Sequence, residues 1–175
     1  MNSNIEIRKK IASGWFRFLQ SQICKEFEEI ERKKSNGRKV YSIKKTTWKK
    51  SENPKEGGGT YAIIKNGTIF DSVGINFSEV SGKFQKKFRS QILGAKRNPN
   101  YWASGISVVA HMKNPKIPAM HFNTRFIVTS KNWFGGGMDA TPSIKDDKEK
   151  KFFHKKIKKI LLLEKLKSKV HVRAK

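Results

Sequence analysis

Residues 105–125 read GISVVAHMKNPKIPAMHFNTR, and this stretch predicts two β-strands joined by a proline-marked loop. Apolar and polar residues alternate on both sides of the loop with the period of two that is typical of a strand. Pro115 and Pro118 cannot donate to a β-ladder and have a fixed φ, so they place the loop between the strands. The stretch therefore predicts an antiparallel hairpin with one apolar and one polar face.

The polar face of this hairpin gathers side chains that can bind or react. A loop centred near Lys116 sets His111 opposite His121, and Ser107 opposite Arg125, about 5 Å apart. Lys greatly outnumbers Arg in this chain, so an Arg on a strand favours planar, bidentate recognition of a carboxylate. The alternative is an ordinary amphipathic hairpin whose polar face meets water. The face behind the polar one is apolar and consists of Ile106, Val108, Ala110, Phe122, Thr124, Phe126 and Val128.

Motifs in chain order carry a family resemblance. Residues 105–126 are similar to the GVSxVxHPxNPxxPxxHxNxRF stretch of oxygen-dependent coproporphyrinogen III oxidases. Residues 74–82 (GINFSEVSG) resemble the family's GVNFSxVHG, and residues 132–142 (NWFGGGMDATP) resemble its WWFGGGxDLTP. The sequence FFHK at 152–155 resembles HxFHR, and Trp48 followed by EGGG is a looser match to W-x-R-x-E-GGGG.

The resemblance implies an α+β fold in which an antiparallel β-sheet is flanked by α-helices. It implies the oxidative decarboxylation of coproporphyrinogen III to protoporphyrinogen IX in haem biosynthesis, with molecular oxygen as co-substrate. Two propionates become vinyl groups, and no electron-carrying cofactor is required because the electron-rich porphyrinogen can itself reduce oxygen. The family also implies a homodimer, and we expect neither a nucleic acid nor a membrane as partner.

The same resemblance assigns roles to individual residues. The substrate-binding positions are Ser107, Asn123, Thr124 and Arg125, and the catalytic positions are His121, Asp139 and Arg125. His121 matches the proton donor, a role that suits an imidazole near neutral pH, and Asp139 can accept from pyrrole N–H groups. His111, His121 and His154 match positions assigned to a divalent metal, although they could equally bond substrate or backbone.

The net charge and the cysteine content of the chain limit its possible functions. The chain of 175 residues has a formal net charge of +25, which would attract any polyanion. The alternative function is therefore a non-catalytic basic module that binds nucleic acid or another polyanion. Lys is spread along the whole chain, however, which favours a compositional habit over a binding patch.

Cys24 is the only cysteine, so an intramolecular disulfide and a Cys-rich zinc site are excluded. Without a signal peptide or a long apolar run, we expect a cytoplasmic protein.

The remaining segments predict the rest of the fold. Residues 5–33 predict an amphipathic helix, 39–49 a strand and 51–59 a loop whose glycines either bind an anion or allow two chains to approach closely. Asn66-Gly67 marks a hairpin turn. We expect residues 84–100 to cover one edge of the sheet, 132–137 to bend, and 143–163 to form a helix capped by Ser143 or Thr141. The core-facing stripe of the first helix is predicted as Ile7, Ile11, Trp15, Phe18, Leu19, Ile23, Phe27 and Ile30.

The domain prediction is a single domain, 1–175, equivalent to the N-terminal half of the oxidase fold and incomplete at its C-terminus. The family matches run from about residue 48 to residue 159, and residues from about 161 to 175 resemble no family segment. We expect this tail to be foreign to the family and the chain alone to be a poor catalyst.

Overall fold

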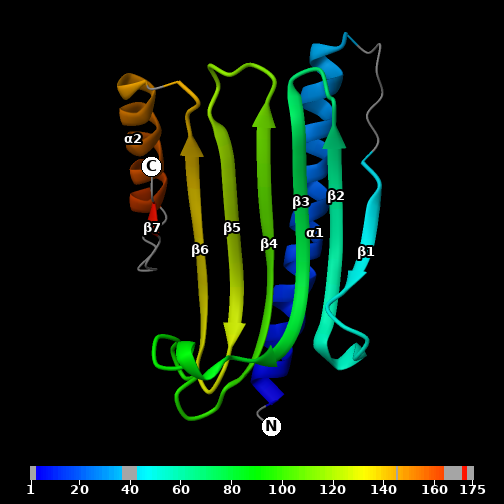
Figure 1. Ribbon diagram of the computed structural model, residues 1–175, viewed down its shortest axis with the longest axis vertical. Helices are drawn as coiled ribbons and strands as arrows, with labels where there is room; N and C mark the ends of the chain where they lie inside the picture. Colours follow the sequence, from blue (N-terminus) through cyan, green and yellow to red (C-terminus); the bar gives the residue numbers. More distant parts are fainter. Residues whose placement is uncertain (1–2, 37–42, 145, 164–170, 173–175) are drawn as a thin grey trace.

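Six consecutive strands form an antiparallel meander, and a short seventh strand pairs parallel to the sixth (Figure 1). The computed structural model describes residues 3–36, 43–144, 146–163 and 171–172. The predicted α+β class, an antiparallel sheet flanked by helices, is confirmed. In chain order the elements are α1 (Ser3–Lys34), β1 (Lys45–Lys49), η1 (Pro54–Glu56), β2 (Gly57–Lys65), β3 (Phe70–Lys83), η2 (Lys86–Phe88), β4 (Asn100–Met112), β5 (Ala119–Val128), β6 (Asn132–Thr141), α2 (Asp147–Leu163) and β7 (His171–Val172).

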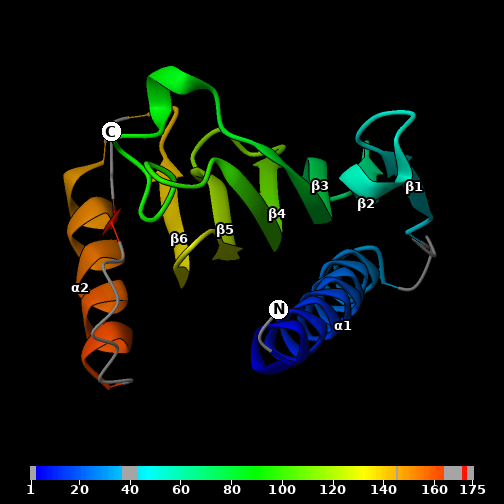
Figure 2. The same ribbon diagram turned by 90° about the horizontal axis from the view of Figure 1, so that it is seen from below.

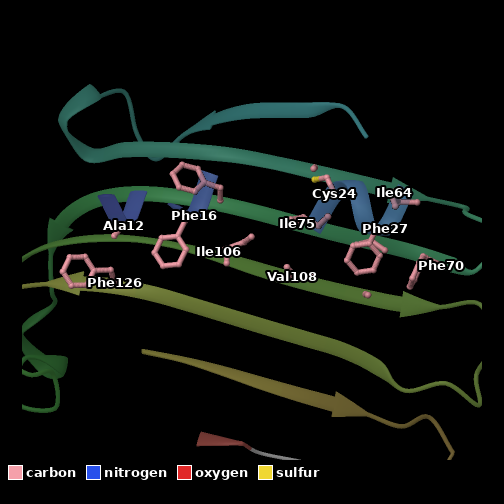
Figure 3. Close-up of a cluster of buried hydrophobic side chains, with 14 residues drawn as sticks. Ala12, Phe16, Cys24, Phe27, Ile64, Phe70, Ile75, Ile106, Val108 and Phe126 are labelled. Carbon is pink, nitrogen blue, oxygen red and sulfur yellow. The ribbon is translucent and has the colours of Figure 1, made fainter. Parts of the chain in front are cut away.

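Helix α1 packs on one face of the sheet, across β2, β3 and β4 (Figures 1 and 2). Its buried side chains meet every second residue of these strands, as the period-two pattern requires (Figure 3). The rings of Phe27 and Phe70 lie edge to face at 4.9 Å. Burial also raises the pKa of the Cys24 thiol, which faces this core. The core consists of Ala12, Phe16, Cys24, Phe27, Ala62, Ile64, Phe70, Val73, Ile75, Phe77, Ile106, Val108, Ala110 and Phe126.

Five of the eight residues predicted for the stripe of α1 are exposed and do not face the core: Ile7, Ile11, Trp15, Phe18 and Ile30. Leu19, Ile23 and Phe27 do pack there, but Trp15 is 54% exposed and Ile11 67% exposed. The helix carries two apolar stripes, and the strands contact the one that runs through Ala12 and Phe16. The other stripe remains on the surface and consists of Ile7, Ile11, Trp15 and Phe18.

Two polar side chains of α1 are buried because they satisfy backbone groups of the sheet. Gln20 Nε2 donates to the carbonyl oxygens of Thr60 (2.8 Å) and Ile75 (3.0 Å). The Glu31 carboxylate, with no exposed surface, accepts the N–H groups of the β2–β3 turn at 2.6–3.0 Å. These contacts tie the middle and the C-terminal end of the helix to particular parts of the sheet, so α1 cannot slide along the sheet without leaving buried groups unpaired.

The hairpin turn at Asn66-Gly67 is confirmed, with Asn66 at a φ of 54°. The strand predicted for 39–49 is shorter, since β1 begins at Lys45 and residues 37–42 lie outside the described part.

The glycines at 57–59 and 135–137 were predicted in a loop and a bend, but both runs lie within strands, β2 and β6. A Cβ on Gly58 or Gly59 would collide with the neighbouring strands, which supports close approach of two chains as the reason for the run.

Two further expectations need correction. Residues 84–99 form turns and η2 at the end of the sheet, where Gly94 lies against Thr129, and do not cover an edge. This follows because they connect two interior strands, β3 and β4. The helix predicted for 143–163 begins later, since α2 starts at Asp147. Its cap is Asp146 and not Ser143 or Thr141, because Asp146 Oδ1 accepts two backbone N–H groups at 2.9 and 3.0 Å. Within the described residues, no helix combines the length and the apolar character that a membrane crossing needs.

We predict that Glu31→Ala lowers the free energy of unfolding by about 3 kcal/mol or more, because three backbone N–H groups lose a charged acceptor. The matched control is Glu29→Ala on the same helix, where the carboxylate pairs with Arg32 at the surface. That control should leave stability nearly unchanged, because the pair is exposed to solvent. Urea unfolding of the two variants measures both values, and equal losses would contradict the role of Glu31.

Candidate active site

The face of the sheet opposite α1 carries the polar side chains of the β4–β5 hairpin; we call it the open face. Ile106, Val108 and Ala110 are buried against α1, so the alternate residues of β4 point the other way. Figure 2 shows α1 on one side of the sheet, and neither of the two described α-helices covers the other side. The structure brings five predicted site residues together on the open face: Ser107, His111, His121, Asn123 and Arg125.

The predicted pairing register of this hairpin was wrong by two residues. Ser107 pairs with Asn123 and not with Arg125, and His121 pairs with Val109 and not with His111. The hairpin is centred on Pro115, one residue before the predicted Lys116. Because the shift is an even number of residues, every side chain keeps its predicted face.

His121 lies between a hydroxyl and a carboxylate. Its Nδ1 is 3.3 Å from Asp139 Oδ2 on β6, and its Nε2 is 3.4 Å from Ser107 Oγ on β4. A carboxylate only accepts hydrogen bonds, so Nδ1 carries the proton that faces Asp139. Nε2, which lies near Ser107 Oγ, is then the ring nitrogen that can exchange a proton with a ligand on the open face.

The sequence of contacts from Ser107 through His121 to Asp139 is also that of a hydrolase triad. Such a triad needs N–H donors that converge on an oxyanion. Ser107 lies in the middle of β4, between β3 and β5, and the strand ladders use the backbone groups around it. The geometry therefore favours proton transfer to a bound ligand over acyl transfer.

Arg125 and Asn123 form the second polar pair of the open face. Arg125 Nη1 donates to Asn123 Oδ1 at 3.0 Å. This contact occupies the amide oxygen and turns the amide NH₂ outward, beside the remaining guanidinium donors. Both side chains therefore offer donors, as a carboxylate ligand requires. Thr124, also predicted to bind substrate, pairs with the buried Ile106, so its side chain lies on the face of α1.

The three histidines predicted to hold a metal do not gather in the described structure. His111 lies on the open face with its Nδ1 3.4 Å from Ser72 Oγ. His154 is on α2, which lies on the side of the sheet that carries α1 (Figure 2). Among the described residues, no three His, Cys, Asp or Glu side chains are placed to hold a metal ion. The metal site therefore stays a prediction.

Asn76 on β3 also lies on the open face, although it was not predicted there from the residue pattern. Asn76 pairs with Ser107, which pairs with Asn123, so the three form one row across the open face. Trp48 Nε1 on β1 donates to Asn76 Oδ1 at 2.9 Å. The alternation of Ile75, Asn76 and Phe77 was the available signal, since it places Asn76 opposite two core residues.

Residues without side chains and exposed apolar residues surround this polar row. Val109 is 36% exposed and Ile63 is 42% exposed, unusual for side chains in the middle of a sheet. A Cβ on Gly74, between them, would meet nothing within 4 Å. A broad ligand with an apolar body and a polar rim would fit such a surface. The glycines on this face include Gly59, Gly74, Gly105, Gly135 and Gly137.

Comparison with known proteins identifies a family. A family model described as coproporphyrinogen III oxidase matches residues 12–175. An oxygen-dependent coproporphyrinogen-III oxidase of Rickettsia typhi is 49% identical over 148 residues, which cover 83% of this chain and 52% of the relative. The enzyme of that name from Rickettsia rickettsii is 45% identical over 159 residues, or 90% of this chain and 55% of the relative. The chain thus spans about half the length of the curated relatives it matches.

We predict opposite outcomes for two glycines of the open face. Gly74→Ala should leave stability unchanged or slightly raised, because the new methyl group enters open space in a strand interior. Gly105→Ala should cost about 2 kcal/mol, because its Cβ would meet the Thr124 carbonyl and the Arg125 side chain. Thermal unfolding compares the two, and a Gly74 variant as unstable as the Gly105 variant would refute an uncovered face.

Proposed function

Because the chain belongs to the coproporphyrinogen III oxidase family, we propose that its open face binds coproporphyrinogen III for oxidative decarboxylation to protoporphyrinogen IX, a step of haem biosynthesis. The observation that carries this proposal is the juxtaposition of a carboxylate-binding pair, Asn123 and Arg125, with a proton-transfer pair, His121 and Asp139. Substrate and activity are proposed here for a chain about half as long as the relatives that bear the name.

The proposed reaction has simple requirements for the protein. In each of two propionates a C–H bond and the bond to the carboxylate carbon break, a C=C bond forms, and carbon dioxide leaves. The two electrons released per propionate pass to molecular oxygen, which also takes up protons. The protein must hold the carboxylate, steady the macrocycle and move a proton.

The side chains of the open face suit these tasks. Arg125 can hold one propionate through two parallel hydrogen bonds, and the Asn123 amide and Ser107 hydroxyl can complete its coordination. Asp139 can orient His121 and accept a pyrrole N–H with its other oxygen. His121 then donates or accepts the proton near the reacting carbon.

The setting of the protein is part of the proposal. We place it in the cytoplasm and expect it to associate as a homodimer. The net charge of +25 would help to collect a tetracarboxylate, as it would any polyanion, including nucleic acid. Binding that survives added salt distinguishes the proposed site from a general basic surface, whose affinity falls steeply with ionic strength.

We predict that Arg125→Ala weakens binding of coproporphyrin III, the stable oxidised analogue of the substrate, by roughly thirtyfold or more. Arg125→Lys should recover only part of the loss, because an ammonium group lacks the planar fork. Fluorescence titration in buffer of physiological ionic strength measures the three affinities. The matched control is Arg97→Ala, which removes the same charge from the exposed β3–β4 connection. A Lys variant that binds like the parent protein would show that charge alone matters.

We predict that residues 1–175 alone turn over coproporphyrinogen III slowly, because the described residues leave the open face uncovered and water is not excluded from it. Oxygen consumption and carbon dioxide release are measured with this chain alone. They are measured again after addition of a separately expressed polypeptide corresponding to the unmatched half of the Rickettsia typhi relative. Activity that rises on mixing supports the proposal, whereas full turnover by the chain alone would contradict the need for a cover.

A further inference from the structure

We infer that Asn76 is a further carboxylate-binding residue of the open face and that Trp48 orients it for this role. The inference deepens the proposed function, since it rests on that function for the identity of the ligand, a tetrapyrrole propionate. The observation behind it is the 2.9 Å hydrogen bond from Trp48 Nε1 to Asn76 Oδ1.

The hydrogen bond fixes which end of the amide a ligand meets. An indole N–H can only donate, so the atom facing Trp48 is the amide oxygen and the NH₂ group is turned away from it. Among the described residues no acceptor is bonded to Asn76 Nδ2. The half-buried side chain therefore presents two N–H donors that remain available on the open face.

The indole reaches Asn76 only because the strand between them carries a glycine. Trp48 on β1 pairs with Gly59 on β2, which pairs with Ser78, two residues along β3 from Asn76. A Cβ on Gly59 would lie 2.9 Å from Cζ2 of the Trp48 ring. The glycine thus lets the ring lie across β2. This arrangement gives a role to Trp48 and to the glycine run, two motifs that the proposed reaction does not use.

Asn76 repeats the arrangement on the other side of the site. There, Arg125 Nη1 also occupies the amide oxygen of Asn123 and leaves its NH₂ group free to donate. Asn76, Ser107 and Asn123 stand in register on three adjacent strands, so the two amides are about 10 Å apart. A macrocycle with several propionates on its rim could place one on the Asn123–Arg125 side and another on Asn76.

The test uses Asn76→Asp, which keeps an oxygen for Trp48 but replaces the donor NH₂ by a second carboxylate oxygen. Two probes are used: coproporphyrin III and benzene-1,3,5-tricarboxylate, a flat polycarboxylate without a tetrapyrrole. We expect Asn76→Asp to weaken both by roughly tenfold or more and Asn76→Ala by roughly fivefold. Trp48→Phe should give an intermediate loss, because the amide becomes free to flip. The matched control is Asn114→Asp, an Asn whose Oδ1 likewise accepts one N–H but in the β4–β5 loop, and it should bind as the parent does.

A second readout separates binding from a purely structural role. In ¹⁵N-labelled parent protein, the side-chain NH₂ signals of Asn76 should shift on titration with either probe, while those of Asn114 should not. If coproporphyrin binds the parent and Asn76→Asp equally, the inference is overturned and the proposed function stands. If the tricarboxylate shifts the Asn76 signals but coproporphyrin does not bind, the proposed function falls and the carboxylate role stands. If neither probe shifts them, the inference is overturned.

Discussion

The packing of α1 on one face of the sheet is the contact on which the rest of the structure depends. It buries alternate residues of β3 and β4, among them Ile75, Phe77 and Ile106, and so commits their neighbours to the open face. A register slip of one residue would bury Asn76 and Ser107 and expose those apolar side chains. The free energy of core burial thus excludes such slips, and the polar row is held in place by residues that never touch a ligand.

The sequence was sufficient for those features that depend on local alternation. The β4–β5 hairpin, its faces and the grouping of Ser107, His121 and Asn123 all follow from a period of two. The pairing register does not follow from it, because the number of residues that the proline loop consumes depends on its backbone geometry. The error of two residues left the faces intact but changed the neighbours, and so the contact between His121 and Ser107 was not foreseen.

Other features were beyond the sequence because they depend on contacts between distant segments. Helix α1 has two apolar stripes, and periodicity alone cannot decide which one meets the strands. Buried Gln20 and Glu31 look like surface residues until the carbonyl and N–H groups that they satisfy are known. Asn76 gains its meaning only from Trp48, which is two strands away across a glycine.

The order of groups along the strands gives the candidate site its logic. On β5, Arg125 lies two residues to one side of the row of Asn76, Ser107 and Asn123, and His121 lies two residues to the other side. Each step of two residues advances about 6.8 Å along a strand. A carboxylate held in the central row therefore leaves its neighbouring carbon atoms within one step of the imidazole. Ser107 is both a member of that row and a contact of His121, so it connects the groups that hold the ligand with the group that moves the proton. The proton-transfer pair contributes the carboxylate of Asp139, which pairs with His121 and lies, like it, one step of two residues from the donor row. This separation keeps like charges apart while a negatively charged ligand is bound.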